Sequence, residues 1–286
     1  VFRAPMGDRA RRAALTAEER AFWAVVLSVA WTLSIALALA AADRYRFGTL
    51  LSINAIASLA LAVAYRSRLR YAEATGRPSL GALAPAALVA LGLWMHPVAS
   101  EYVMGGKDPG TYMNEGIQIG QHGSLTIHDP ALAALPEEFR PMFLPGEPEG
   151  DSQGLHQGVR FMGFFVADRS RGEVIGQFPH AFPSWIAIAY GLDGLSGARR
   201  AVGVWAILGL LAVYFAGARF VGRAPAFAAA LLLGVNVATV WYARYPNSEM
   251  MQQALLFAAL LALARAYRDD DRFFAPVAAV LFGSLL

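Results

Sequence analysis

Three acidic residues and one arginine in this sequence have side chains suited to catalysis, and they lie in polar segments between long apolar ones. Asp108 and Glu115 belong to one polar segment, and Arg244 and Glu249 belong to another. Two carboxylates that lie close together can hold a divalent cation, and a single carboxylate can act as a general base. An arginine can bind a phosphate group through paired hydrogen bonds. These residue types therefore suit acid–base chemistry on a phosphate-bearing substrate.

The spacing of Asp108 and Glu115 predicts that both acids lie along one side of a helix. If Pro109 is the first helical residue, Asp108 is the N-cap, and Glu115 follows about two turns later. Such a helix, which also carries Tyr112 and Met113, would lie in the interface plane just outside a membrane. A simpler alternative is that Asp108 only caps the helix and that Glu115 is solvated.

The second polar segment has alternative interpretations of the same kind. Glu249 starts an apolar run, so it is also explained as a first-turn acid of a helix that Asn247 or Ser248 caps. Arg244 lies at a membrane boundary, where an arginine can extend its charged end to water without binding a substrate. Neither residue is assigned a function by its position alone.

The composition is that of a membrane protein. Of the 286 residues, 57% are hydrophobic and 16% are charged, whereas an ordinary soluble domain has about a quarter charged residues. The arginines stand between apolar segments, so the net charge of +3 indicates membrane topology and not a nucleic-acid partner. The absence of cysteine excludes disulfides, thiolate metal sites and a cysteine nucleophile. The sequence contains no phosphate-binding glycine loop, and its five histidines do not have zinc-site spacing.

The apolar runs predict an all-α polytopic membrane protein, a bundle of transmembrane helices with a small α/β extracytoplasmic region. Residues 1–20 form a cytoplasmic segment, 21–97 three spans, 98–197 the outer region, and 198–286 further spans. The final apolar run, from Phe273, is shorter than a span, so we expect a fragment that is truncated at its C-terminus. The predicted spans are Ala21–Ala42, Gly48–Tyr65, Leu80–Pro97, Ala201–Ala218, Ala224–Ala243 and Met250–Ala266.

The outer region is predicted to combine interfacial helices, an irregular loop over residues 129–157, and a β-hairpin. The segments Val159–Ala167 and Val174–Phe178 are rich in β-formers, and Gly172 lies in the polar connection between them. Residues 181–192 are apolar but too few to cross a membrane, so we predict an interfacial or re-entrant helix. If this run does not cross, the arginines of the later spans lie mostly on the cytoplasmic side, and the Arg244–Glu249 segment emerges on the side of Asp108.

The order of these features resembles the GT-C superfamily of polytopic glycosyltransferases, most closely the bacterial dolichyl-phosphate-mannose mannosyltransferase-like family. The resemblance covers roughly residues 80–286 and rests on three pieces. The first is the acidic opening of the outer region in Lys107-Asp-Pro-Gly-Thr-Tyr112. The second is the proline-bracketed Phe178-Pro-His-Ala-Phe-Pro-Ser-Trp185, which runs on to Gly194 and Ala198-Arg-Arg200. The third is Ala243-Arg-Tyr-Pro-Asn-Ser-Glu249, where an arginine and an acid emerge two spans later.

The resemblance implies a sugar donor linked to a polyprenyl phosphate, an acceptor hydroxyl on a glycan, lipid or protein, and transfer with inversion at an extracytoplasmic site of the plasma (inner) membrane. It implies that Asp108 and Glu249 are catalytic, with Asp108 as the general base. The two acids are also the expected ligands of a divalent cation, Mg²⁺ or Mn²⁺, and Arg244 and Arg200 are expected to bind the donor phosphate. The other candidate site residues are Glu115, Tyr112 and His180.

One departure from the family concerns the metal site, and two other functions are weighed against the glycosyltransferase. Many family members have a second acid directly after the first, where this chain has Pro109, so Glu115 or Glu249 would have to replace it at a metal site. A transporter or lipid flippase predicts acids near the middle of the spans, and the predicted spans have none. A non-catalytic membrane scaffold would use the outer hairpin as its partner surface.

Overall fold

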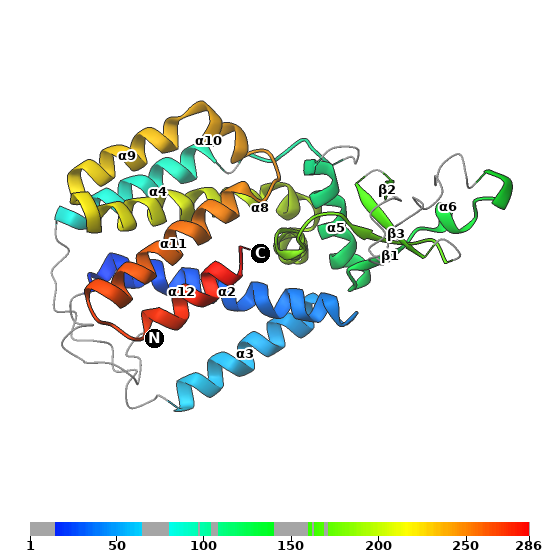
Figure 1. Ribbon diagram of the computed structural model, residues 1–286, viewed down its shortest axis with the longest axis horizontal. Coiled ribbons are helices and arrows are strands. Elements are labelled where there is room, and N and C mark those ends of the chain that lie inside the picture. The colour runs from blue at the N-terminus through cyan, green and yellow to red at the C-terminus, as the bar shows by residue number, and fades with distance from the viewer. Residues whose placement is uncertain are drawn as a thin grey trace, which may run out of the picture. The chain divides into compact units, whose positions relative to one another are not determined.

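The computed structural model describes residues 15–64, 80–96, 98–103, 108–139, 160–161, 163–168 and 171–285. Within these residues the chain is mostly helical with one small sheet, and it divides into two compact units (Figure 1). The first unit comprises the described parts of Val1–Thr32, Leu51–Ala99 and Val202–Leu286, and the second comprises those of Leu33–Leu50 and Ser100–Ala201. The predicted cytoplasmic segment 1–20 lies outside the described residues as far as residue 14.

Among the described residues, four helices are long and apolar enough to cross a membrane, as expected for a polytopic membrane protein. They confirm that apolar helices form at the predicted spans near residues 21, 48, 201 and 250. Three of the helices begin within a few residues of the prediction, whereas the helix at residue 201 is the second part of α8, which begins at Ala181. A fifth predicted span, at residues 80–97, forms the short helices η1 (Leu80–Ala82) and α4 (Leu83–Met95) instead. The four long helices are α2 (Ala17–Ala41), α3 (Phe47–Ala64), α8 (Ala181–Val221) and α11 (Glu249–Arg268).

The prediction of one continuous span over Ala224–Ala243 is wrong. This segment forms α9 (Arg223–Val235) and α10 (Val237–Tyr242), and Asn236 between them has an extended backbone with φ −65° and ψ 137°. The Asn236 side chain accepts a hydrogen bond of 2.9 Å from the backbone N–H of Ala238. Asparagine competes in this way with the helical hydrogen bonds, so it ends α9 and caps α10.

Aromatic side chains and glycines pack the first unit. Trp23 of α2 lies 5.0 Å from Phe274 of α12 (Phe274–Gly283), and Phe22 lies 5.1 Å from Phe215 of α8, measured between ring centroids. Gly92 of α4 lies against Ile207 of α8, where a Cβ at position 92 would come within 2.6 Å of the isoleucine Cγ1. Such close approach of helix backbones at small residues is typical of membrane helix packing.

The second unit contains α5 (Asp108–His122) and the first part of α8, which is kinked at Asp193 and Gly194. The predicted helix over residues 181–192 is therefore confirmed, and it ends at the kink, where Gly194 has a φ of +54°. A positive φ suits glycine and breaks the helical path. The C-terminal end of α5 is tied to residues near α2, because the Tyr45 N–H donates to the Gly123 carbonyl at 3.0 Å.

The small sheet of the second unit has the strand order β1-β4-β3-β2 and is antiparallel throughout. Strands β3 (Phe164–Asp168) and β4 (Glu173–Gly176) confirm the predicted hairpin, and Gly172 in the turn has a φ of +66°. Ile127, Val166 and Val174 face a common apolar cluster. Of the predicted irregular loop, residues 140–157 lie outside the described residues. The remaining elements are β1 (Thr126–His128), α6 (Pro130–Ala133), η2 (Glu137–Phe139) and β2 (Arg160–Phe161).

Candidate functional site

Helix α5 begins at Asp108, and it exposes this carboxylate at its N-terminus while the following turn is buried. Asp108 is exposed, whereas every residue from Pro109 to Met113 is buried. The unpaired N–H groups and the dipole of a helix N-terminus favour a negative charge at this position. The packed helix thus holds an accessible carboxylate in a fixed place, as a general base requires.

Glu115 lies two turns further along α5 and is completely buried, so the alternative that it is solvated is wrong. Its side chain is 0% exposed, and its Oε1 pairs with Nδ1 of His180 in the segment that leads into α8. Two of the candidate residues, 65 positions apart in the chain, are therefore in direct contact. The imidazole is 25% exposed.

Two glycines allow this close approach of α5 to its neighbours. A Cβ at Gly176, the last residue of β4, would overlap the Glu115 carboxylate. A Cβ at Gly116 would come within 2.8 Å of the Pro183 carbonyl oxygen and 2.5 Å of Ile186 Cβ. Side chains at these positions would force α5 away from β4 and α8, so the glycines are part of the geometry that buries Glu115.

Burial raises the pKa of the Glu115 carboxyl above its ordinary value, and the hydrogen bond and charge of His180 act in the opposite direction. Oε2 of Glu115 has no hydrogen-bond partner among the described residues. A buried carboxylate with a single partner is costly to ionise, because desolvation penalises the charged form.

Tyr112 packs inside an aromatic cluster. Its ring stacks on Phe178 at 4.7 Å and meets Phe182 edge-on at 5.5 Å, and its side chain is buried. Offset stacking and edge-to-face contacts of this kind stabilise the packing of α5 against the segment that carries His180. A role of Tyr112 in substrate contact stays a prediction.

Arg200 is exposed and is positioned by its own helix. It donates a hydrogen bond to the Ser196 hydroxyl and lies 3.7 Å from Asp193 at the kink of α8. Its neighbour Arg199 has a structural role that the sequence did not indicate: its Nε donates to the Ser100 carbonyl, and its own carbonyl accepts from the Ser100 N–H at 2.8 Å. Arg200 is thus the arginine of the two that remains accessible for a phosphate group.

Arg244 and Glu249 lie in the first unit and are both exposed. The Arg244 guanidinium donates to the Met95 carbonyl at 3.4 Å, at the C-terminal end of α4. Glu249 is the first residue of α11, as expected for a first-turn acid, but the Ser248 side chain makes no capping hydrogen bond. The Asn247 amide donates to Glu249 at 3.5 Å.

Asp108 and Glu249 belong to different compact units, so the expectation that they share one site stays a prediction. In the part of the chain that the structure describes, no group of three or more His, Asp and Glu side chains is placed to hold a metal ion. The divalent cation expected at Asp108 and Glu249 is likewise a prediction.

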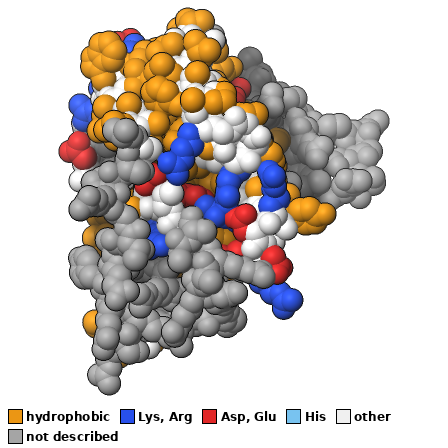
Figure 2. Space-filling model, turned by 90° about the vertical axis from the view of Figure 1, so that its left-hand side faces the viewer, with side chains coloured by type: hydrophobic (Ala, Val, Ile, Leu, Met, Phe, Trp, Pro, Cys, Tyr) orange, Lys and Arg blue, Asp and Glu red, His pale blue; other side chains and the backbone are white. Residues whose placement is uncertain are grey.

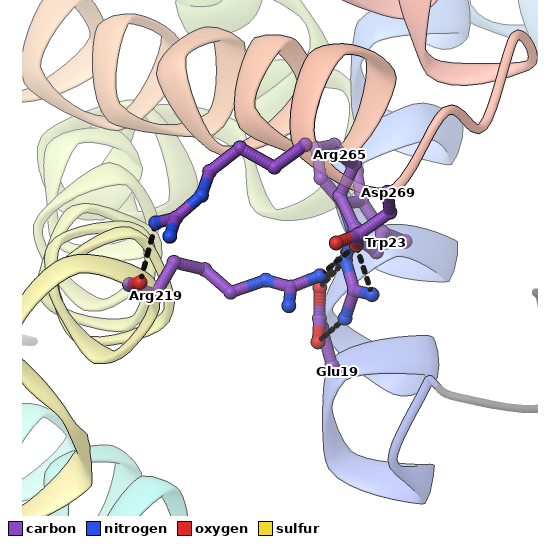
Figure 3. Close-up of polar contacts among 6 residues, drawn as sticks. Glu19, Trp23, Arg219, Arg265 and Asp269 are labelled. Carbon is purple, nitrogen blue, oxygen red and sulfur yellow. Dashed lines mark hydrogen bonds and ion pairs between the residues drawn. The ribbon is translucent and has the colours of Figure 1, made fainter.

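A network of charged residues in the first unit was not predicted. Arg265 of α11 binds both carboxylate oxygens of Glu19, with Nε to Oε1 at 2.9 Å, and its Nη1 donates to Asp269 at 2.8 Å (Figure 3). Asp269 also forms an ion pair with Arg219, and the Arg219 carbonyl accepts a hydrogen bond of 3.1 Å from Arg268. The Trp23 Nε1–H donates a hydrogen bond of 3.4 Å to Glu19. Figure 2 shows basic and acidic side chains gathered on one face of the molecule.

This network joins three helix ends: the start of α2, the end of α8 and the end of α11. The side chains of Glu19 and Arg265 are 8% and 6% exposed. The pair was not predictable from the sequence because its members are 246 positions apart and neither lies in a recognisable motif.

Comparison of the chain with models of protein families, with curated proteins and with solved structures found no match.

Proposed function

We propose that this protein is a membrane glycosyltransferase that moves a sugar from a polyprenyl-phosphate donor to a hydroxyl group on the extracytoplasmic side. The observation that carries the proposal is the exposed carboxylate of Asp108 at the start of a helix whose next turn is fully buried. A carboxylate held at a membrane-proximal helix end can accept a proton from a bound hydroxyl.

The Glu19–Arg265 ion pair supports the topology on which the proposal depends. Residues in direct contact at the ends of two spans lie on the same side of a membrane, so the chain between them crosses an even number of times. Arg219 joins the same network through Asp269, so the end of α8 lies on that side too. The proposed topology counts α2, α3, the shorter helix α4 and the second part of α8 as crossings between Glu19 and Arg219, and an additional crossing at residues 181–192 would make their number odd.

The contact of Arg244 with Met95 places its guanidinium at the end of α4. Met95 is the last residue of α4, and the chain leaves α4 there for the segment that leads to Asp108. The guanidinium is exposed, and its flat, forked array of donors is suited to a phosphate group. In the proposed reaction Arg244, with Arg200, binds the phosphate of the lipid donor.

In the proposed reaction an acceptor hydroxyl attacks the anomeric carbon of the sugar from the face opposite the phosphate. The hydroxyl proton passes to Asp108, the bond between oxygen and the anomeric carbon forms, and the bond from that carbon to the phosphate oxygen breaks. Negative charge develops on the released lipid phosphate, and the arginines stabilise it. A divalent cation held by Asp108 and Glu249 would supply further positive charge there.

A transfer assay tests this proposal directly. The purified protein in liposomes is given a polyprenyl phosphate that carries a radiolabelled sugar, together with a mixture of membrane glycan, lipid and protein acceptors. Transfer that disappears with Asp108→Asn supports the proposal. A transporter would instead move the labelled donor between leaflets without breaking the sugar–phosphate bond, and a scaffold would do neither.

A further inference from the structure

The Glu115–His180 pair is the one buried acid–imidazole contact among the described residues of the second unit, and the reaction above does not use it. The carboxylate is 0% exposed and the imidazole is 25% exposed. Nδ1 faces Glu115, so Nε2 is the ring nitrogen that this contact leaves unused. A carboxylate in this position fixes the orientation of the ring and the nitrogen that carries each proton.

The protein holds this pair rigidly. Gly176 lies directly over the Glu115 carboxylate, and Gly116 packs against Pro183 and Ile186 in the first turns of α8. The His180 carbonyl accepts hydrogen bonds from the Ser184 backbone N–H at 3.0 Å and from its hydroxyl at 2.8 Å, which fixes the residue at the start of α8. The Glu115 carboxylate cannot reach water without separating α5 from β4 and α8.

The charge balance of the pair indicates that it holds a proton. Oε2 of Glu115 is without a hydrogen-bond partner among the described residues, so His180 is the group that compensates the carboxylate charge. The other titratable groups on the packed elements are Asp108, Tyr112 and His122 on α5 and Glu173 at the opposite end of β4, and α8 has none before Tyr190. Removing the shared proton would leave a buried negative charge with only a neutral partner, which is costly.

We propose that Glu115 and His180 act as a general acid, with His180 donating a proton from Nε2 to the lipid phosphate that leaves the sugar. This inference rests on the proposed function. As the bond between the anomeric carbon and the phosphate oxygen breaks, that oxygen takes the Nε2 proton, and the electron pair of the broken bond stays on the phosphate. Asp108 then releases the proton that it accepted to water, and the pair takes up one proton from water. Asp108 and His180 thus have opposite roles, one accepting a proton and the other donating one.

The test is the pH dependence of labelled-sugar transfer in liposomes, measured for the wild type, His180→Gln, Glu115→Gln and the control His122→Gln. His122 is an exposed histidine at the end of α5, so its replacement changes the histidine count without touching the pair. We expect wild-type transfer to fall at alkaline pH as the pair loses its proton. His180→Gln should transfer about 100-fold more slowly at neutral pH and lose the alkaline fall.

Glu115→Gln keeps the size of the side chain but removes the charge that holds the proton on the imidazole. In this variant the alkaline fall should move to lower pH. The proposal is overturned by a wild-type profile that stays flat through alkaline pH, by an unmoved profile in Glu115→Gln, or by His180→Gln transfer equal to that of His122→Gln. An inactive wild type at every pH would reject the glycosyltransferase proposal itself, and this inference with it.

Discussion

Glu19 and Arg265, 246 positions apart in the sequence, form a buried ion pair in which the guanidinium binds both oxygens of the carboxylate. The pair links the start of α2 to the end of α11, and Asp269 extends it to Arg219 at the end of α8. Two buried charges in this arrangement compensate each other only while both are present.

Removing one partner of this pair should destabilise the protein strongly. Arg265→Met leaves the Glu19 carboxylate buried without its main partner, and we expect a loss of about 3–5 kcal/mol in the free energy of unfolding. The double variant Glu19→Gln with Arg265→Met should recover most of this loss. Denaturation in mixed micelles measures the free energy of unfolding of the single and the double variant. Equal losses in the single and double variants would show that the ion pair is not the cause.

The same pair predicts which loops share a side of the membrane. The chain has no cysteine, so single cysteines can be introduced and labelled in intact vesicles with a reagent that does not cross membranes. Thr16→Cys and Asp270→Cys should be labelled from one side, and Tyr245→Cys should be labelled from the other. Labelling of positions 16 and 270 from opposite sides would contradict the topology.

The sequence predicted well those features that depend on neighbouring residues. Unbroken apolar runs of sufficient length located α2, α3 and α11, and Gly172 between two β-prone segments located the hairpin. Strand β1 was missed because it has three residues and pairs with β4, which lies almost fifty positions later. Periodicity is a property of one segment and does not show which distant strand completes a sheet.

The candidate site was predicted in part. The exposed Asp108 at a helix start follows from the Asp-Pro dipeptide, whereas the burial of Glu115 does not follow from its own helix. Glu115 is buried because Gly176 and His180 cover it, and both belong to a segment more than sixty positions away. The break at Asn236 was missed because a polar residue inside an apolar run has little weight in hydropathy.

The stability of the protein should depend on pH through Glu115. Burial raises the pKa of this carboxyl in the folded state above its ordinary value of 4.5, so the folded state binds the proton more tightly than the unfolded state does. The tighter proton binding stabilises the folded state below pH 4.5, and this contribution is lost as pH rises through the folded-state pKa of Glu115. Melting temperatures of the wild type should therefore fall relative to those of Glu115→Gln over this range. Curves that stay parallel would contradict the raised pKa.

Arg244 should matter for donor binding more than for the stability of the fold. Its side chain is exposed and makes one long hydrogen bond to Met95, so Arg244→Gln should change the melting temperature little. Loss of a guanidinium contact to phosphate should raise the KM for the polyprenyl-phosphate donor about tenfold or more. Arg223→Gln, an exposed arginine at the start of α9, is the matched control. Equal donor KM values in the two variants would remove Arg244 from the phosphate site.

The most direct measurement of the central claim is transfer of a labelled sugar from a polyprenyl-phosphate donor by the purified protein in liposomes. Wild type, Asp108→Asn and Glu101→Gln, which replaces another exposed acid of the second unit, are compared with and without added Mg²⁺ or Mn²⁺. We predict transfer by the wild type and by Glu101→Gln, and a loss of about 100-fold or more in Asp108→Asn, which still inserts into the membrane. Full transfer by Asp108→Asn, or none by the wild type under any of these conditions, would contradict the account.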